Sequence, residues 1–341
     1  MTRVHGGPGP SGPARWDFST NANTCGPCPG VLAKVQAADP TRYPDPAYTA
    51  LRAALGAFHG VDPDRLVPTA SASEAIVLLT AQAVRQGARS AAWPLHAYGD
   101  YAHAASAWGL SPPAPPLVSG PAMAAAPGRP ADLRWWCDPS SPLGQTVDLA
   151  AEPHGRLLTV LDCAYTPLRL TPHAPTRVPE GVWQMWTPNK ALGLTGLRGA
   201  YLIAPTAADA ATLERLGPSW PLGSHAVAML QAWTDLATQH WLAEARQTLR
   251  GWKTQLLATL RAHGWQMLPS DANFLCARPP QTLDPAALAA HGVQLRDATS
   301  FGLPGWWRLG VLPPPALAAL RAALTAQAPA GACPSPPTVI P

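Results

Sequence analysis

Short apolar segments alternate with helical segments through the first two thirds of this chain of 341 residues. Strands are predicted from the apolar runs near residues 88–93, 132–137, 157–162, 181–186 and 199–204. Helical segments precede or separate them, near residues 46–59, 72–86 and 99–109. This alternation is typical of an α/β fold in which a mixed, mostly parallel sheet carries helices on both faces. We therefore expect a three-layer α/β/α large domain.

The last third of the chain has a different pattern. Residues 206–264 are mostly helical. Shorter elements follow, with strands near 273–278, 292–296 and 306–311 and helices near 284–291 and 314–327. This pattern indicates a smaller α+β domain. The expected division is an N-terminal segment that belongs with the small domain (1–43), the large domain (44–235), the small C-terminal domain (236–328) and a Pro-rich tail (329–341).

The composition excludes several classes of protein. The net charge is only +4 and no block of like charge occurs, which argues against a nucleic-acid surface. Pro, Gly or charged residues interrupt the apolar runs before they reach the length of a membrane span, and the opening residues lack the apolar core of a signal peptide. We therefore expect a cytoplasmic protein with no nucleic-acid or membrane partner. The 6 dispersed cysteines are interpreted as free thiols.

Lysine is rare in this chain. Of the 24 basic residues, only Lys34, Lys190 and Lys253 are lysines. Lys190 comes just after the predicted strand 181–186, in the segment TPNKALGLTGLRGAYLIAP. Where arginine fills almost every cationic position, a lysine at a strand end indicates a need for an amine that can lose its proton. Such an amine can form a Schiff base with an aldehyde.

Polar residues at other strand ends complete a candidate site. The strand LLTVLD ends in Asp162, and Tyr165 follows three residues later. Upstream, the strand LRWWC leads into DPSSPLGQ, a turn shaped by Pro139 and Pro142. Because ligands of open α/β sheets bind at the carboxyl ends of the strands, we expect these side chains to lie near Lys190. A pyridoxal phosphate site needs such an amine, a carboxylate for the pyridine nitrogen and a phenol for the ring oxygen.

These segments resemble those of the fold-type I pyridoxal-phosphate enzymes of the class I/II aminotransferase family, in the branch that contains histidinol-phosphate aminotransferase and the threonine-phosphate decarboxylase of cobalamin biosynthesis. The resemblance extends from about residue 5 to about residue 327 and implies an aminotransferase-like fold with pyridoxal 5'-phosphate (PLP) as cofactor. TPNKALGLTGLRGAY matches the lysine loop, which implies that Lys190 forms the Schiff base and that Thr187 and Arg198 hold the phosphate. LDCAY implies that Asp162 pairs with the pyridine nitrogen and Tyr165 reaches the phenolic oxygen.

The resemblance implies further cofactor contacts. DPSSPLG corresponds to the family's Asn-Pro-x-Asn-Pro-x-Gly turn, and Ser141 stands where the second Asn would touch the phenolic oxygen. Tyr98 matches an aromatic residue that stacks on the cofactor ring. Tyr43 matches a tyrosine that reaches the cofactor phosphate of the neighbouring subunit, which implies a homodimer with a shared active site. The segment TASASEAI matches the phosphate cup at a helix N-terminus, formed by Ser71, Ala72 and Ser73.

Substrate contacts are implied at the two ends of the chain. Arg308, in FGLPGWWRLGV, matches the arginine that holds the carboxylate of an amino acid, for which a bidentate fork is suited. Arg296 matches an arginine that related enzymes use on a substrate phosphate or carboxylate. The segments HGG and FSTNANTCG resemble the part of threonine-phosphate decarboxylases that closes over the substrate, with His5, Asn21 and Asn23 as contacts.

Three functions remain open. The first is a PLP-dependent lyase of the threonine-phosphate decarboxylase type, which the HGG and Asn-rich segments favour; it is our main expectation. The alternative is an aminotransferase of the histidinol-phosphate type, which would use the same cofactor residues. The remote third is a non-catalytic effector-binding module. Leu312 stands where the decarboxylase tends to carry another arginine, which weakens the case for a phosphorylated substrate.

The motif CGPC over residues 25–28 has the spacing of a thioredoxin-type redox pair. It does not follow a strand as such motifs do, so we interpret Cys25 and Cys28 as incidental. Thr24 and Cys25 stand between Asn23 and the glycine, where the family usually has Asn-Pro before its Gly. The histidines show no paired ligand spacing, and no metal is expected.

Overall fold

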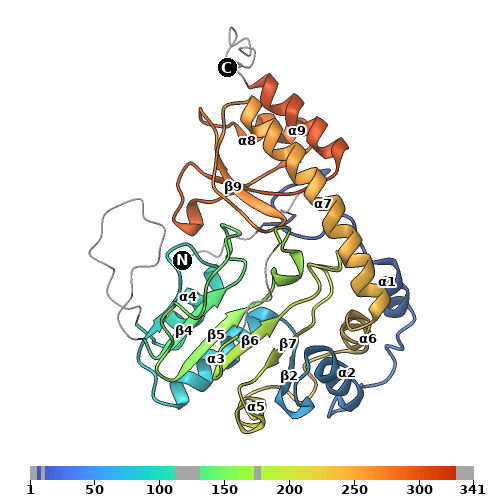
Figure 1. Ribbon diagram of the computed structural model, residues 1–341, viewed down its shortest axis with the longest axis vertical. Coiled ribbons are helices and arrows are strands. Elements are labelled where there is room, and N and C mark those ends of the chain that lie inside the picture. Colours follow the sequence, from blue (N-terminus) through green and yellow to red (C-terminus); the bar gives the residue numbers. More distant parts are fainter. Residues whose placement is uncertain (1–5, 9–11, 112–130, 173–177, 328–341) are drawn as a thin grey trace.

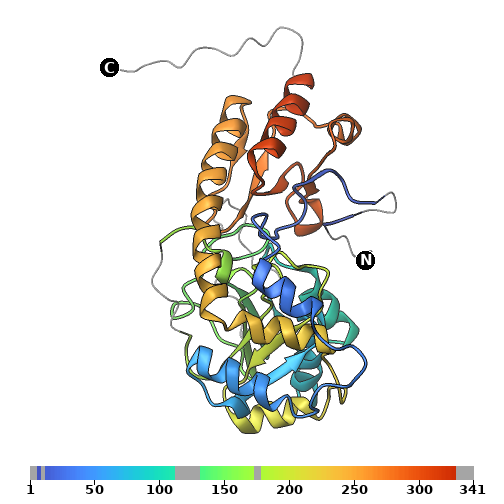
Figure 2. The same ribbon diagram turned by 90° about the vertical axis from the view of Figure 1, so that its right-hand side faces the viewer.

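The computed structural model describes residues 6–8, 12–111, 131–172 and 178–327. These residues form two main sheets, and the long helix α7 (Leu236–Ala262) extends from one to the other (Figures 1 and 2). No helix in these ranges is long and apolar enough to cross a membrane.

The larger sheet has the strand order β2-β7-β6-β5-β4-β3. Its strands are β2 (Leu66–Thr69), β3 (Ala91–Ala92), β4 (Leu133–Cys137), β5 (Leu158–Asp162), β6 (Val182–Trp186) and β7 (Ala200–Ile203). The strands from β3 to β6 are parallel, whereas β7 pairs antiparallel with both β6 and β2. The mixed, mostly parallel sheet expected from the alternating pattern is confirmed.

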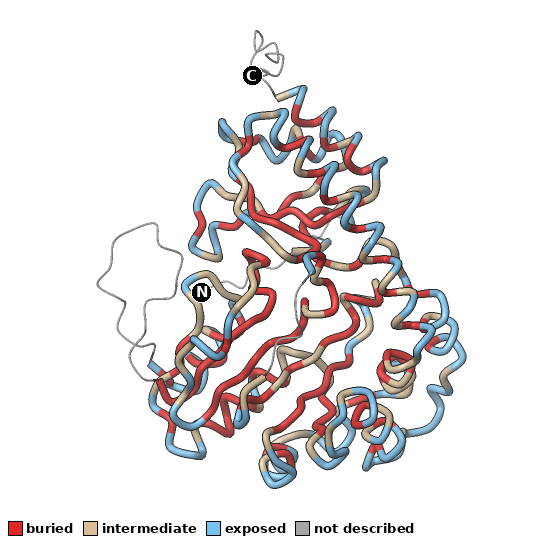
Figure 3. The backbone as a smooth tube through the Cα atoms, viewed as in Figure 1, coloured by how far each residue is buried: buried red, intermediate tan, exposed pale blue. Residues whose placement is uncertain are grey.

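Helices cover both faces of this sheet. Successive strand residues point to opposite faces, so Trp135 and Trp136 of β4 belong to different hydrophobic clusters. The face of Trp135 packs against α3 (Ala72–Arg85), α4 (Gly99–Ala107) and α5 (Ala207–Glu214). On the other face, residues of β2 and β7 pack in one cluster with α1 (Pro29–Gln36), α2 (Thr49–His59) and α6 (Ser224–Trp233), whereas Trp136 packs with Leu149, Leu161 and Val182. The central strands are therefore buried, as Figure 3 shows.

The smaller sheet is antiparallel and has the order β11-β12-β9-β8. Its strands are β8 (Gln266–Met267), β9 (Phe274–Arg278), β11 (Arg296–Asp297) and β12 (Trp307–Gly310). Apolar residues of α7, α8 (Pro285–Ala290) and α9 (Pro314–Ala326) pack in one cluster with those of β9 and β12. Nearby, β1 (Trp16–Asp17) pairs parallel with β10 (Val293–Gln294). Single turns of 3-10 helix occur at η1 (Pro63–Arg65), η2 (Thr166–Leu168) and η3 (Thr299–Phe301).

Besides the two-residue strands β1 and β8, which the pattern does not predict, the structure differs from the predicted elements at β2 and near residues 292–296. The apolar pattern does not predict β2, because this strand has only four residues and contains Pro68, which is tolerated because β2 lies at the edge of the sheet. The expected strand near 292–296 is split into β10 and β11, which pair with different strands. The domain boundaries stay a prediction, and the tail 329–341 lies outside the described residues.

Candidate active site

A cavity of about 120 Å³ lies at the carboxyl ends of the parallel strands. Its lining includes every cofactor residue expected from the sequence except Tyr43, namely Ser71, Ala72, Ser73, Tyr98, Ser141, Asp162, Tyr165, Thr187, Lys190 and Arg198. Residues from separate strands and loops meet here because β4, β5 and β6 run in the same direction and end at one edge of the sheet. The lining also includes Ala164, Asn189 and Gly199, which the sequence motifs did not single out.

The Lys190 amine is available for chemistry. Its Nζ lies 5.2 Å from the centre of the Tyr165 ring. No described residue forms a hydrogen bond or ion pair with this Nζ. Leu194 N donates to Asn189 O (2.8 Å) and Asn189 Nδ2 donates to Leu197 O (3.1 Å), so the loop that carries the lysine is braced internally. An amine held in this way is placed to attack an aldehyde.

Asp162 is a buried carboxylate that forms no ion pair with any residue in the described part of the chain. Its Oδ2 accepts a hydrogen bond from Tyr101 Oη (2.6 Å), and its Oδ1 accepts one from Ala164 N (2.9 Å). Burial raises the pKa of the Asp162 carboxyl, while the Tyr101 hydrogen bond and the charge of Lys190 act in the opposite direction. A cation placed at the cavity side of this carboxylate would therefore be strongly favoured, and a protonated pyridine nitrogen is such a cation.

Tyr101 was missed by sequence reasoning. It follows Tyr98 by three residues, and its ring stacks on Trp135 beneath the cavity, with ring centroids 4.9 Å apart and an interplanar angle of 9°. Tyr98 meets the Tyr101 ring edge to face, with centroids 5.8 Å apart. The sequence signal for Tyr101 is its position three residues after Tyr98 at the start of a helix, because residues i and i+3 lie on one side of a helix.

The first turn of α3 and the residues around it offer donors for an anion. Ser71 is the N-cap, and its Oγ accepts a hydrogen bond from Glu74 N (3.1 Å). The first N–H groups of a helix lack partners within the helix and attract phosphate. Thr187 Oγ1 is buried and has no hydrogen-bond partner among the described residues. Arg198 likewise forms no ion pair with a described residue, so its charge is available to an anion.

This donor set fits PLP. The cofactor needs an amine for its aldehyde, an anion for its pyridinium, a hydroxyl for its phenolic oxygen and donors for its phosphate. Lys190, Asp162 and Tyr165 supply the first three within one cavity. The unpartnered hydroxyl of Thr187 is satisfied if a phosphate occupies the other end of the cavity.

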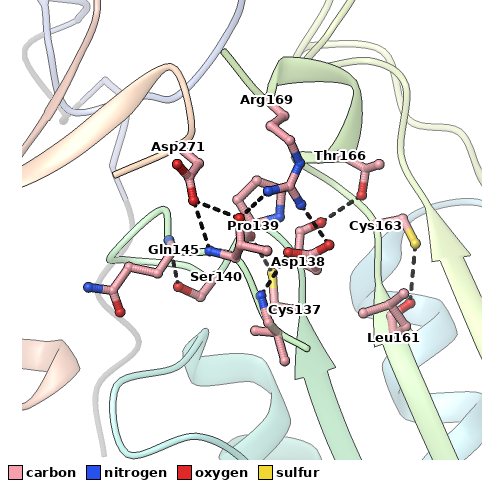
Figure 4. Close-up of polar contacts among 12 residues, drawn as sticks. Cys137, Asp138, Pro139, Ser140, Gln145, Leu161, Cys163, Thr166, Arg169 and Asp271 are labelled. Atoms are coloured by element: carbon pink, nitrogen blue, oxygen red, sulfur yellow. Dashed lines mark hydrogen bonds and ion pairs between the residues drawn. The ribbon is translucent and has the colours of Figure 1, made fainter. Parts of the chain in front are cut away.

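The turn that carries Ser141 is held by polar contacts on both sides (Figure 4). Arg169 forms an ion pair with Asp138 (2.6 Å), and Thr166 Oγ1 donates to Asp138 O (2.6 Å). Within the turn, Gln145 N donates to Ser140 Oγ (3.0 Å) and Ser140 N donates to Gln145 O (2.8 Å). The side chain of Ser141 is thereby held at the boundary of two cavities, because it lines both.

A larger cavity of about 940 Å³ adjoins the first and shares Tyr98, Ser141, Tyr165 and Lys190 with it. Arg296 and Arg308 both line it. These two residues are directly opposite each other in the antiparallel pair of β11 and β12. Like charges opposite each other in a sheet are unfavourable unless an anion lies between them or close by. This part of the larger cavity is therefore suited to an anionic group of a substrate.

Each arginine is oriented by its neighbours. The Arg308 guanidinium lies over the rings of Phe274 (5.9 Å) and Phe301 (5.4 Å), and its Nη2 donates to Ser19 O (2.8 Å). Its Nε is buried without a hydrogen-bond partner among the described residues. Arg296 lies over Phe301 (4.9 Å). Burial lowers the pKa of Arg308, and burial together with the charge of Arg308 lowers the pKa of Arg296.

Of the other residues expected at the site, only one lines a cavity in the described structure. Asn21 lines the larger cavity, and its Nδ2 donates to Tyr165 Oη (3.2 Å). Asn23 lines neither cavity; its Nδ2 donates to Ala191 O (2.9 Å) behind the lysine loop. Tyr43 is 79% exposed and lines neither cavity, and His5 lies outside the described residues.

The environment of the CGPC motif is unlike that of a reactive thiol. Burial raises the pKa of Cys25 to about 11, whereas a redox cysteine needs a lowered one. Cys25 and Cys28 are both free thiols. Across the described ranges, no group of three or more His, Cys, Asp or Glu side chains is arranged to hold a metal ion.

Comparison with known proteins identifies the family. Residues 137–324 match the model of aminotransferase class I and II. The chain is 32% identical over 333 residues to histidinol-phosphate aminotransferase 2 of Caulobacter vibrioides, covering 91% of this chain and 85% of that protein. It is 29% identical over 316 residues to the histidinol-phosphate aminotransferase of Ruegeria pomeroyi, covering 86% of each.

Solved structures share the fold. The histidinol-phosphate aminotransferase of Sinorhizobium meliloti, in complex with pyridoxal-5'-phosphate, has a TM-score of 0.70 at 20% identity and covers 91% of this chain and 90% of its own. The L-threonine-O-3-phosphate decarboxylase of Porphyromonas gingivalis has a TM-score of 0.72 at 21% identity, covering 91% and 98%. The fold is therefore that of the fold-type I enzymes, and the chain belongs to the class I and II aminotransferase family of PLP-dependent enzymes.

Proposed function

We propose that this enzyme is an aminotransferase of the histidinol-phosphate type that uses Lys190 to bind PLP covalently. The observation that carries the proposal is the meeting of Lys190 and the buried Asp162 in one cavity that opens beside the paired arginines Arg296 and Arg308. The relatives at 32% and 29% identity are histidinol-phosphate aminotransferases, which supports the aminotransferase over the decarboxylase.

Our main expectation from the sequence, a threonine-phosphate decarboxylase, is less well supported. A decarboxylase is found among the solved structures at 21% identity, and likeness at that level shows the fold alone. The HGG and Asn-rich segments favour the decarboxylase, but Asn23 lies behind the lysine loop and lines neither cavity. The aminotransferase is therefore the better supported of the two functions.

Each residue of the cavity would have a separate role in transamination. PLP, when bound, supplies an aldehyde and a ring that withdraws electrons from the substrate carbon. Asp162 would hold the proton on the pyridine nitrogen, because a cation stabilises its buried carboxylate. Tyr165 would donate its hydroxyl proton to the phenolic oxygen, since its own oxygen accepts from Asn21. Lys190 Nζ, once released from PLP by the substrate amine, would take the proton from the substrate α-carbon, since it has no competing hydrogen bond with a described residue.

The paired arginines suit the proposed substrate. Histidinol phosphate has a primary amine and a phosphate monoester, which carries up to two negative charges. Two guanidinium groups opposite each other in β11 and β12 provide charge and forked donors for such a group. The same pair would accept the carboxylate of the amino acid or 2-oxo acid that takes part in the other half of the reaction.

A product assay tests the proposed function. The purified enzyme with PLP is given histidinol phosphate and 2-oxoglutarate, and in a separate reaction O-phosphothreonine alone. We expect glutamate to form in the first reaction in step with loss of histidinol phosphate, and no CO₂ in the second. Release of CO₂ with an amine product in the second reaction, without glutamate in the first, would contradict the proposal and identify the enzyme as a decarboxylase.

Replacing Arg308 by lysine is expected to raise the KM for the amino substrate by at least about tenfold, because the charge stays while the forked donors are lost. PLP affinity should stay the same, since Arg308 lines only the larger cavity. Steady-state kinetics and PLP titration separate the two effects. Arg321→Lys, on an exposed position of α9, is the matched control. Equal losses of substrate and PLP affinity would remove Arg308 from the substrate site.

We also propose a homodimer in which Tyr43 reaches the phosphate site of the second copy. Within its own chain the side chain is exposed and stacks on Trp220, with ring centroids 4.7 Å apart. Tyr43→Phe keeps this stacking and removes the hydroxyl, so PLP binding should weaken by about 1–2 kcal/mol, the scale of a hydrogen bond to a charged group. Light scattering measures the oligomer and titration measures the affinity; a monomer, or an unchanged affinity, would contradict the proposal.

A further inference from the structure

The segment Asn21–Cys28 runs beside the loop that carries Lys190. Asn23 N donates a hydrogen bond to Lys190 O (2.9 Å), and Asn23 Nδ2 donates to Ala191 O (2.9 Å). Cys28 N donates to Leu192 O (2.9 Å). Three consecutive carbonyl groups of the lysine loop therefore accept hydrogen bonds from this one segment. We call the segment Asn21–Cys28 the N-terminal clasp.

Two glycines let the clasp and the lysine loop touch through their backbones. A Cβ on Gly26 would lie 2.9 Å from Leu192 O and 3.1 Å from Gly193 Cα. Gly193 has φ +68°, and a Cβ there would lie 3.0 Å from Asn23 O. All three distances are shorter than ordinary carbon contacts, so a side chain at either position would push the clasp away from the loop.

The other side of the clasp is fixed to the smaller sheet. Asn273, just before β9, donates from its Nδ2 to Asn21 O (3.2 Å) and Ala22 O (3.1 Å). Thr24 Oγ1 donates to Val311 O (2.8 Å), just after β12. The clasp therefore has a fixed position between the smaller sheet and the lysine loop.

The Asn23 amide is held in a single orientation. Its Oδ1 accepts a hydrogen bond from Cys25 N (3.0 Å), which leaves Nδ2 to donate to Ala191 O. The side chain is buried, so water does not replace either contact at low cost. An aspartate at this position would keep the contact with Cys25 N but would bring a second oxygen against the carbonyl of Ala191.

We propose that the N-terminal clasp sets the position of the Lys190 backbone, and that Asn23 is a positioning residue for the covalent attachment of PLP to Lys190. The inference rests on the proposed role of Lys190. Covalent attachment requires Nζ to meet the aldehyde carbon at bonding geometry, and misplacement of a reacting group by about 1 Å can cost about a hundredfold in rate. Asn23 and the Gly26 of the CGPC motif then have a common role, distinct from substrate binding and from redox chemistry.

The test uses the full-length enzyme and two clasp variants, Asn23→Asp and Gly26→Ala. Gly30→Ala in α1 is the matched control, because a Cβ at Gly30 meets no atom within 4 Å. For each protein the readouts are PLP affinity, the rate at which the Lys190–PLP linkage forms by stopped-flow absorbance, the pH midpoint of the visible band and the Tm of the PLP-free protein. We expect both clasp variants to form the linkage about tenfold more slowly and with a shifted pH midpoint, and Gly30→Ala to match the unchanged enzyme.

The outcomes separate a positioning role from a merely structural one. If Asn23→Asp lowers the Tm but has the linkage rate and pH midpoint of Gly30→Ala, the clasp only stabilises the fold and the inference is overturned. If Gly26→Ala does not fold, the linkage rate and pH midpoint of Asn23→Asp alone decide between the two roles. Failure of the unchanged enzyme to form any linkage would overturn the proposed function itself, and it would be seen before any variant is measured.

Discussion

Lys190→Ala is expected to abolish the visible absorbance of covalently bound PLP and to reduce transamination by at least about a thousandfold. The variant loses both the amine that binds the aldehyde and the base that moves the α-proton, and a positioned base alone contributes about 10²–10⁴-fold. Asp162 and the phosphate donors remain, so the variant should still bind PLP without the covalent bond. Absorbance spectra and kcat/KM measure the two effects.

Lys34→Ala is the control for this experiment. Lys34 is exposed, pairs with Asp235 at 2.6 Å and lines neither cavity. Surface ion pairs of this kind contribute little, so spectra and rates should match those of the unchanged enzyme. A Lys190→Ala protein that kept the visible band would show that another amine holds the cofactor.

Asp162→Asn is expected to reduce kcat/KM by at least about a hundredfold. The substitution preserves size and can preserve the contacts with Tyr101 and Ala164, but it removes the negative charge opposite the pyridine nitrogen. Leaving a buried charge without its partner costs about 3–5 kcal/mol, and every 1.4 kcal/mol corresponds to a factor of ten. The proton on the pyridine nitrogen is then lost more easily, and with it the electron-withdrawing power of the ring.

The measurement is kcat/KM together with the Tm of the PLP-free protein. Asp162→Asn should raise that Tm or leave it unchanged, because burial raises the pKa of the free carboxyl and the charge is unfavourable when no cation is bound. Asp64→Asn, at an exposed position of η1, controls for loss of a negative charge in general. A kcat/KM within tenfold of the unchanged enzyme would show that Asp162 is not the partner of the cofactor nitrogen.

The sequence predicts the layers of the fold because β4, β5 and β6 are buried on both faces and therefore appear in the sequence as apolar runs. It does not predict β2, whose four residues include a proline. The end of β5 predicts Asp162 at the site, since strand direction determines where a strand-end residue lies. The register of β11 and β12, which brings Arg296 opposite Arg308, depends on pairing between separate strands and is not present in any local pattern.

Two residues show where sequence reasoning fails. Tyr101 looks like an ordinary helix residue, and only the arrangement of α4 against β5 brings its hydroxyl to Asp162. Asn23 carries the pattern of a substrate contact, yet its partners Lys190 and Ala191 are distant in sequence and close only in the folded chain. Hydrogen bonds between distant segments are set by tertiary packing, which propensity and spacing do not describe.

Reductive trapping of the cofactor tests the central claim most directly. The enzyme is incubated with PLP, reduced with borohydride, digested and analysed by mass spectrometry. Because Lys34, Lys190 and Lys253 are the lysines of the chain, a labelled lysine peptide is assigned without ambiguity. The account predicts the pyridoxyl phosphate label on the peptide that contains Lys190. Label on Lys34 or Lys253 in its place, or no label on any lysine, would contradict it.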